Sequence, residues 1–315
     1  MPKLIDLLKR TVSDWQHDDT GRMAASLAYY AAISIAPLLI VVIAVAGWVF
    51  GEDAARGAVM DQLGGVLGND SAATVESMIA GADKPRTGLI ATAMGIAVLL
   101  FGATGVFVEL QSSMNAIWDV EPKPGGGPMA FIRHRVLSLA MVLGIAFLLL
   151  ISLALSAGLT ALGSALEPYI PGAPIVWELV MFGASFLIIT LLFGMIFKVL
   201  PDVNVRYRDV WIGAAFTAAL FVLGKFLVGI YLKQADVATS YGAAGSVVVM
   251  LLWVYYSAHI FFFGAEFTQA YAHLHGSRWE PTRDAIPAQH GKHPERRAGG
   301  RELNAPLLAD EQRDR

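Results

Sequence analysis

The chain has 315 residues, of which 56% are hydrophobic and only 16% are charged, and its mean hydropathy is +0.56. Because soluble domains average about 25% charged residues, this composition excludes an ordinary soluble protein. A net charge of −3 gives no basic field for a nucleic acid, and the absence of cysteine excludes disulfides, thiolate metal sites and a cysteine nucleophile.

Residues 1–22 are predicted to form an amphipathic helix on the cytoplasmic side of a membrane. The apolar residues of this segment fall on one helical stripe among basic residues, and they are Leu4, Leu7, Leu8, Val12 and Trp15. Such a helix lies among lipid headgroups or docks on a helical bundle through the same stripe, and the sequence favours neither placement over the other.

A helix needs about 20 apolar residues to cross a bilayer, and six stretches between residues 23 and 275 meet this length. The predicted spans are 23–51, 87–108, 136–166, 178–197, 210–232 and 242–265. Their continuous apolar character is typical of membrane helices, whereas barrel strands alternate between apolar and polar residues. The predicted fold class is therefore all-α, a polytopic transmembrane bundle of six helices.

Two segments outside the spans also have a predicted character. Residues 52–86 follow the first span and carry apolar residues at helical spacing on both sides of Gly68 and Asn69, which predicts a periplasmic insertion of two short helices. Residues 276–315 are rich in Arg, Pro, Gly and Asp, and they are predicted to be a disordered cytoplasmic tail whose basic residues hold the topology.

The orientation follows from the distribution of Lys and Arg. With six spans, eighteen basic residues fall at the two ends of the chain and in the loops on the same side, and four fall in the loops on the opposite side. Because cytoplasmic loops carry the excess of Lys and Arg, both termini are predicted to be cytoplasmic.

No motif of a nucleotide-binding, hydrolase or metal-hydrolase site occurs in the chain. Two histidine pairs, His273 with His275 and His290 with His293, lack acids arranged as in a metal-hydrolase motif. The sequence therefore predicts no catalytic residue, no metal site and no cofactor.

Polar residues within or beside the spans are the candidates for function, because a charge in hydrocarbon costs at least about 2.5 kcal/mol. The candidate set is Lys225, Glu178, Glu109, Glu266, His259, Arg206, Arg208, Tyr255 and Tyr256. Lys225 and Glu178 share the outer half of the membrane by depth. We expect them to face one cavity, where Lys225 would bind an anionic group of a substrate. The alternatives are water in an outward-facing vestibule or Asp236 as the partner of Lys225, snorkelling of Lys225, and an ion pair with a structural role alone.

Glu109 and Glu266 reach the predicted cytoplasmic boundary, where Arg206 and Arg208 are the cations at matching depth. The ends of the second and sixth spans are therefore expected to meet near this loop, as a structural or a functional cluster.

The last span carries a polar and aromatic stripe. His259 lies seven residues before Glu266 and so on the same helix face, with Tyr255 and Tyr256 one turn earlier. The stripe would line an aqueous cavity, or its aromatic residues would anchor the helix at the interface. Small residues also recur every four positions, which predicts close helix packing, and these are Ala24, Ala28, Ala32 and Ala36 on the first span and Ala214 and Ala218 on the fifth.

Several runs carry a recognisable order along the chain: Ala25–Tyr30 with Pro37-Leu38, Gly102–Trp118, Leu200–Asp202 with Val205–Asp209, Tyr241–Ser246, Leu252–Tyr256 and Gly264–Glu266. Over approximately residues 10–273 this order resembles the YihY/BrkB-type inner-membrane protein family. The resemblance implies a six-helix protein of the bacterial inner membrane with a periplasmic helical insertion after the first span. The family carries an old ribonuclease BN label, a virulence-factor label and suggestions of export, and it brings no catalytic residue.

These features favour a multi-pass transporter or exporter of a lipid-like or small anionic solute, with the bilayer as its partner and no nucleic acid. Either a monomer or an oligomer is compatible with the sequence. The alternative is a non-transporting scaffold for envelope integrity, in which every polar residue is structural. An enzyme is not predicted, because a ribonuclease would need a basic surface and paired acids or metal ligands.

Overall fold

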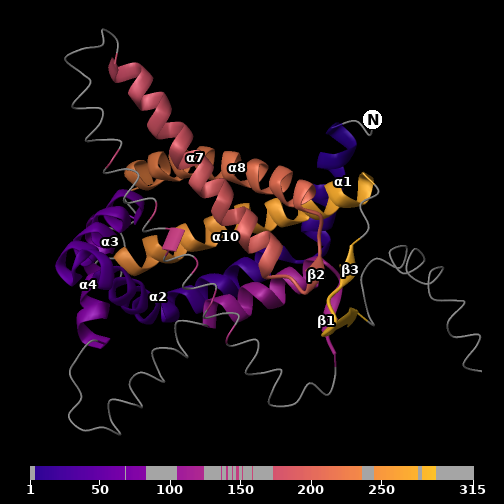
Figure 1. The fold of residues 1–315 in the computed structure, drawn as a ribbon, viewed down its shortest axis with the longest axis horizontal. Coiled ribbons are helices and arrows are strands. Elements are labelled where there is room, and N and C mark those ends of the chain that lie inside the picture. The colour runs from indigo at the N-terminus through magenta and orange to yellow at the C-terminus, as the bar shows by residue number, and fades with distance from the viewer. Residues whose placement is uncertain are drawn as a thin grey trace, which may run out of the picture.

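The computed structural model describes residues 4–67, 69–82, 105–123, 173–235, 245–275 and 279–288, together with seven single positions between Val136 and Gly158. The helices are α1 (Leu4–His17), α2 (Thr20–Phe50), α3 (Glu52–Leu67), α4 (Asn69–Ala82), α7 (Ala173–Val199), α8 (Tyr207–Ala235) and α10 (Gly245–Leu274), and residues 105–117 form a further helix. The strands are β1 (Val120–Pro122), β2 (Val203–Asn204), β3 (Glu280–Pro281) and β4 (Ala285–Pro287) (Figure 1).

Helix α10 is central to the described bundle. It contacts α1, α2, α4 and α8, and α8 in turn packs against α7. Helix α1 and the strands lie at one end of the long helices, and α3 and α4 lie at the other (Figure 1). The first and last described elements, α1 and β4, therefore share one end, which is the arrangement that an even number of crossings produces.

Four of the described helices are long and apolar enough to cross a membrane, at Thr20–Trp48, Trp177–Val199, Tyr207–Val228 and Val247–Leu274. They correspond to the predicted spans 23–51, 178–197, 210–232 and 242–265. The predicted span 87–108, except for its last four residues, and the span 136–166, except for single positions, lie outside the described residues. The count of six spans and the side on which the termini lie stay predictions.

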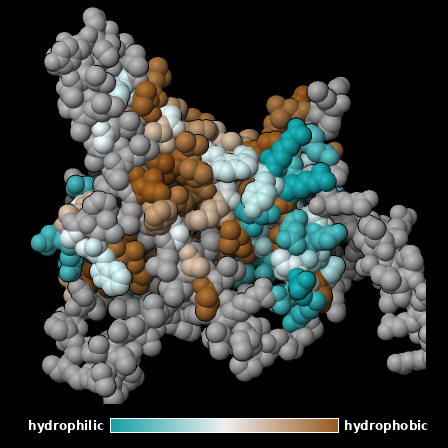
Figure 2. All heavy atoms as spheres, viewed as in Figure 1, coloured by the Kyte–Doolittle hydropathy of each residue, from teal (hydrophilic) through white to brown (hydrophobic). Residues whose placement is uncertain are grey.

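The surface of α7 has the character expected of a lipid-facing helix. Figure 2 shows hydrophobic side chains over α7 in the middle of this face. Leu179, Phe182 and Leu187 are among the exposed residues of this helix, at 67%, 58% and 56%. In water, an exposed apolar patch of this kind would favour aggregation. In a bilayer the same side chains contact hydrocarbon, and their exposure costs no free energy of hydration.

Two residues with positive φ set the entry and exit of α2. Asp19, with φ of 50°, separates α1 from α2, and aspartate is among the few residues that adopt this conformation readily. Gly51, with φ of 87°, separates α2 from α3, and its backbone N–H donates to the carbonyl of Gly47 at 2.9 Å. The chain thus leaves the first span through a tight glycine turn into α3.

Helices α8 and α10 pack through a reciprocal pattern of glycine and threonine. A methyl group added at Gly213 would overlap Thr268, with 2.8 Å between the two Cβ atoms, and one added at Gly264 would overlap Thr217 in the same way. Each threonine hydroxyl donates to the glycine carbonyl of its own helix at 2.7 Å, from Thr217 to Gly213 and from Thr268 to Gly264. Both hydroxyls are therefore satisfied inside a contact that only glycine permits.

The predicted ridges of small residues are buried except at Ala32, which is partly buried. Ala24, Ala28 and Ala36 on α2 and Ala214 and Ala218 on α8 are at most 5% exposed. Ala24, Ala214 and Ala218 belong to one apolar core that also contains residues of α7, α10 and the helix at 105–117. Close backbone approach along these ridges is what small side chains provide in a membrane, where burial from water is not the driving force.

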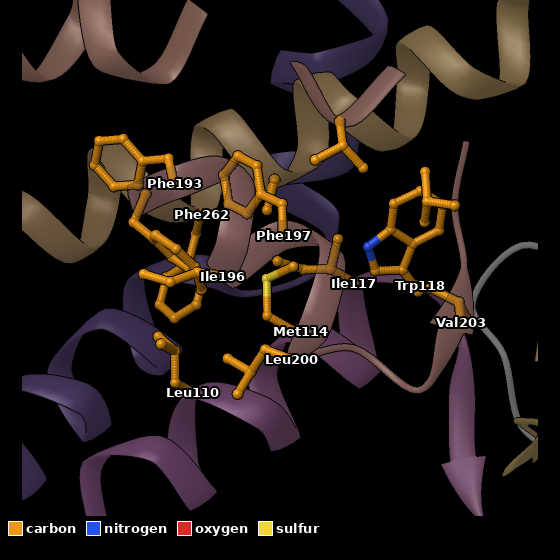
Figure 3. Close-up of a cluster of buried hydrophobic side chains, with 14 of the residues drawn as sticks. Leu110, Met114, Ile117, Trp118, Phe193, Ile196, Phe197, Leu200, Val203 and Phe262 are labelled. Carbon is orange, nitrogen blue, oxygen red and sulfur yellow. The ribbon is translucent and has the colours of Figure 1, made fainter. Parts of the chain in front are cut away.

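The largest side chains of this core gather where α7 meets the helix at 105–117 (Figure 3). Met114, Ile117, Trp118, Phe197 and Phe262 are each at most 1% exposed. Phe197 lies 5.2 Å from Phe261 between ring centroids, within the range of favourable aromatic pairs. The core holds the end of the second predicted span against the ends of α7 and α10.

Helix α1 docks on the bundle through one face and exposes another. Leu7 is buried in a small core with Phe267 and Ala270 of α10. Leu4 and Ile5 remain exposed at 65% and 61%. The two placements left open by the sequence thus correspond to two faces of one helix, one packed on α10 and one free to contact lipid headgroups.

The expectation of disorder from residue 276 onward is wrong for residues 279–288, which form β3 and β4. Strand β4 pairs antiparallel with β1, and β3 pairs antiparallel with β2. The backbone N–H of Thr282 donates to the carbonyl of Asp202, and that of Ala288 donates to the carbonyl of Asp119, each at 2.8 Å. Trp279 packs edge-on against Trp118 at 5.8 Å. A polar composition predicts disorder only for a segment that pairs with no other part of the protein. Here β1 and β2 pair with β4 and β3 and order the segment.

Candidate functional site

The polar residues of α10 cluster toward its C-terminal end. Glu266, Thr268 and Gln269 are 0%, 2% and 1% exposed, although the span at Val247–Leu274 is otherwise strongly apolar. Burying such groups costs free energy unless they are satisfied, so their position in the span needs a structural or functional reason. Thr268 has one, since its hydroxyl donates to the carbonyl of Gly264.

Gln269 ties α10 to the end of the second predicted span. Its Nε2 donates to the backbone carbonyl of Ile117 at 2.6 Å. This contact joins the helices that continue beyond the second and sixth predicted spans, at residues past 108 and 265. The cluster of Glu109 and Glu266 near Arg206 and Arg208 stays a prediction. Sequence reasoning passed over Gln269 because a neutral amide gives no charge signal.

A second connection, partly buried, joins the helix at 105–117 to the loop after α7. Asn115 Nδ2 donates to Asp202 Oδ2 at 2.8 Å, and the backbone N–H of Asp202 donates to Asn115 Oδ1 at 2.8 Å. Gln111 Nε2 lies 3.4 Å from the same carboxylate. Asn115 and Asp202 stand in two of the runs that carry the family resemblance, which was the signal available in the sequence.

Glu266 is the most deeply placed of the predicted acids. Its side chain is fully buried, and both carboxylate oxygens are shielded from solvent. Glu109, on the helix at 105–117, is half-buried. Arg206 and Arg208 lie exposed at the start of α8, and in the part of the chain that the structure describes neither forms an ion pair with Glu109.

His259 joins an aromatic cluster between three helices. The ring of Tyr255, on the same helix, lies perpendicular to the imidazole at 4.5 Å, and Trp15 of α1 lies at 5.5 Å. A methyl group added at Gly21 of α2 would lie 3.7 Å from the imidazole. The imidazole is half-buried, and among the described residues its Nδ1 has no hydrogen-bond partner. His259 therefore packs against Tyr255 of its own helix and Trp15 of α1. The aqueous cavity and the interfacial anchor offered by the sequence analysis stay predictions.

Tyr256 points elsewhere. A methyl group added at Gly224 of α8 would lie 2.9 Å from the Tyr256 hydroxyl oxygen and closer still to Ile260. Tyr256 therefore contacts α8, whereas Tyr255 and His259 face α1 and α2. The predicted stripe divides between two helix interfaces.

Lys225 and Glu178 both lie on the surface. Lys225 is exposed on α8 beside Phe226 and Leu227, and Glu178 is exposed near the start of α7. In the described ranges no ion pair joins them. The structure therefore does not bring these two residues together, and a shared cavity for them remains a prediction.

Comparison with known proteins places this architecture in a family. The family described as "Virulence factor BrkB" matches residues 11–287. The ribonuclease-like protein YfkH of Bacillus subtilis is 23% identical over 83% of this chain and 94% of its own length. A UPF0761 membrane protein of Vibrio vulnificus is 25% identical over 90% of this chain and 87% of its own length.

Other relatives are longer than this chain. A UPF0761 membrane protein of Psychrobacter is 26% identical over 83% of this chain, but the match spans only 47% of that relative. Matches to the relatives from Azotobacter and Pseudomonas likewise span 41% of their lengths. No solved structure matches the chain.

Proposed function

The chain belongs to the BrkB virulence-factor family of membrane proteins, and we propose that it is a transporter that exports a lipid-like or small anionic solute across the bacterial inner membrane. Four long apolar helices support a multi-pass membrane protein. The single observation that carries a transport role is Glu266, a fully buried carboxyl group inside a helix that is long enough to span.

A buried carboxyl group has a specific use in a transporter. A carboxylate in hydrocarbon is costly, and protonation removes the cost, so the group can carry a proton between two sides of a bundle. Glu266 lies on α10, which contacts α1, α2, α4 and α8. A change in its charge therefore acts on the helix that holds most of the described bundle together.

A non-transporting scaffold for envelope integrity is the second candidate, and one observation favours it. Gln269 and Asn115 are buried and Asp202 is partly buried, and the side chain of each makes a hydrogen bond that joins two segments of this chain. If Glu266 is likewise structural, the observation that carries the transport role is removed. Among the relatives described above, YfkH is the one whose name points to a ribonuclease.

The test is transport by the purified full chain in liposomes under an imposed pH gradient. The solutes are a fluorescent phospholipid and a set of small organic anions, measured against protein-free liposomes. The E266Q variant should lose the gradient-dependent transport while retaining its thermal unfolding midpoint. E121Q, a neutralised exposed acid on β1, is the matched control and should transport as the wild type does.

Two results would overturn the proposal. Wild-type liposomes that move none of the solutes faster than protein-free liposomes would leave the scaffold as the better account. Unchanged gradient-dependent transport by E266Q would remove Glu266 from the mechanism.

A further inference from the structure

A cavity of about 300 Å³ lies where α2 ends and α3 begins, partly open to the surface. Ile40 and Ile43 of α2 and Ile79 of α4 form its apolar wall, and Glu52 and Arg56 of α3 supply its charges. Its lining residues belong to α2, α3 and α4, and α3 and α4 lie at the end of the bundle remote from α1 and the strands (Figure 1). Its size is at the lower end of small-molecule sites, which suits a headgroup and not a whole lipid.

The depth of the cavity is that of a membrane boundary. The first span ends at Trp48, which lines the cavity and is 95% exposed. Exposed tryptophan is typical of the interface where lipid headgroups meet hydrocarbon. The cavity has an apolar wall within the span and charged residues beyond the end of the span. The apolar wall suits the hydrocarbon part of an amphiphile, and the charged residues suit its headgroup.

The guanidinium group of Arg56 has a hydrogen-bond donor that no described residue uses. Its Nε atom is buried and, among the described residues, makes no hydrogen bond. Its ion-pair partner Glu76 lies 3.9 Å away, beyond hydrogen-bond distance, and half of the Glu76 side chain is exposed. A guanidinium group offers a planar fork of donors that fits the oxygens of a phosphate.

Glu52 adds the opposite charge to the same cavity. It lies four residues before Arg56 on α3 and so on the same helix face, one turn away. In the described part of the chain the two side chains form no ion pair with each other, although both line the cavity. A cation and an anion one turn apart are complementary to a ligand that carries both charges.

We propose that this cavity binds the headgroup of a zwitterionic amino-phospholipid of the ethanolamine class, with the phosphate on Arg56 and the ammonium on Glu52. The acyl chains lie outside the cavity, in the bilayer beside the exposed Trp48. This inference deepens the proposed function by naming its substrate class, and it rests on that function for transport but not for binding.

The experiment measures lipid retention by the purified full chain in detergent, using native mass spectrometry. Phosphatidylethanolamine and phosphatidylglycerol are offered together at equal concentration, since the second has the phosphate but no ammonium. The wild type should retain phosphatidylethanolamine in preference. R56Q should lower retention of both lipids roughly tenfold, as expected for the loss of charge-assisted hydrogen bonds. E52Q should abolish the preference while keeping phosphatidylglycerol.

Two matched variants control for loss of charge alone. E76Q removes the ion-pair partner of Arg56 without touching the cavity, and D61N neutralises an exposed acid of the same helix. Both should retain the lipids as the wild type does. Soluble glycerophosphoethanolamine at the same concentration should not displace the lipid, because it lacks the acyl chains.

Each contrary outcome has one meaning. Equal or stronger retention of phosphatidylglycerol by the wild type, or an unchanged preference in E52Q, would overturn the inference. Displacement by the soluble compound would reassign the cavity to a water-soluble zwitterion. Selective lipid binding without transport in liposomes would overturn the proposed export but support the binding site. Transport without selective lipid binding would support export but overturn the binding site.

Discussion

Asn115 and Asp202 are joined by two hydrogen bonds of 2.8 Å, one between their side chains and one from the backbone N–H of Asp202 to the side chain of Asn115. The two residues lie 87 positions apart in the chain. The carbonyl of Asp202 also accepts a hydrogen bond from Thr282, so three separate segments meet at one loop. This loop holds the ends of two predicted spans and the segment after α10 together.

The first prediction follows from this pair. N115A removes both hydrogen bonds and leaves the partly buried carboxylate of Asp202 with fewer donors, which should cost about 1–3 kcal/mol. The expected result is a lower midpoint of thermal unfolding for the purified protein. S112A changes an exposed residue of the same helix and should leave the midpoint unchanged. Equal midpoints for the two variants would show that the pair contributes nothing to stability.

The second prediction concerns the segment that follows α10. A chain that stops after residue 278 loses β3 and β4, the hydrogen bonds to Asp202 and Asp119, and the contact of Trp279 with Trp118. A chain that stops after Ala288 keeps all of these contacts. The shorter chain should unfold at a lower temperature and be cut faster by protease near residues 118–123, whereas the longer one should match the full chain. Indistinguishable behaviour of the two truncations would contradict a structural role for β3 and β4.

The third prediction concerns the contact between α8 and α10. G213A places a methyl group on Thr268, so the helices must separate or the protein must fail to fold, at a cost of about 1–3 kcal/mol or more. G183A on α7 meets nothing within 4 Å and is the matched control. In G213A, replacing Thr268 by Ala should restore part of the lost stability, because two of the three overlapping atoms are removed. A midpoint of G213A equal to that of G183A would reject the close contact.

The sequence predicts the parts of this fold that depend on long regular patterns. Continuous apolar runs identify α2, α7, α8 and α10, and alanine at every fourth position identifies faces that are buried. The reciprocal contact of Gly213 with Thr268 and of Gly264 with Thr217 was not predicted. It depends on which faces of α8 and α10 meet, and each helix alone carries only one glycine and one threonine four residues apart.

The remaining features depend on partners far away in the chain. Strands β3 and β4 have two and three residues, too few for a periodic signal, and they exist because β2 and β1 pair with them. Asn115 and Gln269 are neutral, so a search for charges in apolar segments passes over them. For Lys225 and Glu178, depth in the membrane was the only guide, and depth does not say which face of a helix a residue occupies.

The last prediction concerns orientation. Eighteen basic residues on the side of the termini against four on the opposite side predict that both ends are cytoplasmic. A reporter active only in the cytoplasm, fused after Arg315, should therefore be active. A reporter active only in the periplasm should be active when inserted between residues 68 and 69, where α3 ends and α4 begins. The insertion lies at the end of the bundle opposite to the strands. It should therefore disturb neither the core around Trp118 nor the pairing of β3 and β4 with β2 and β1. Exchanging the two reporters should give two inactive fusions. If instead the exchanged reporters are active, the bundle is inverted, and the cavity at Arg56 faces the cytoplasm.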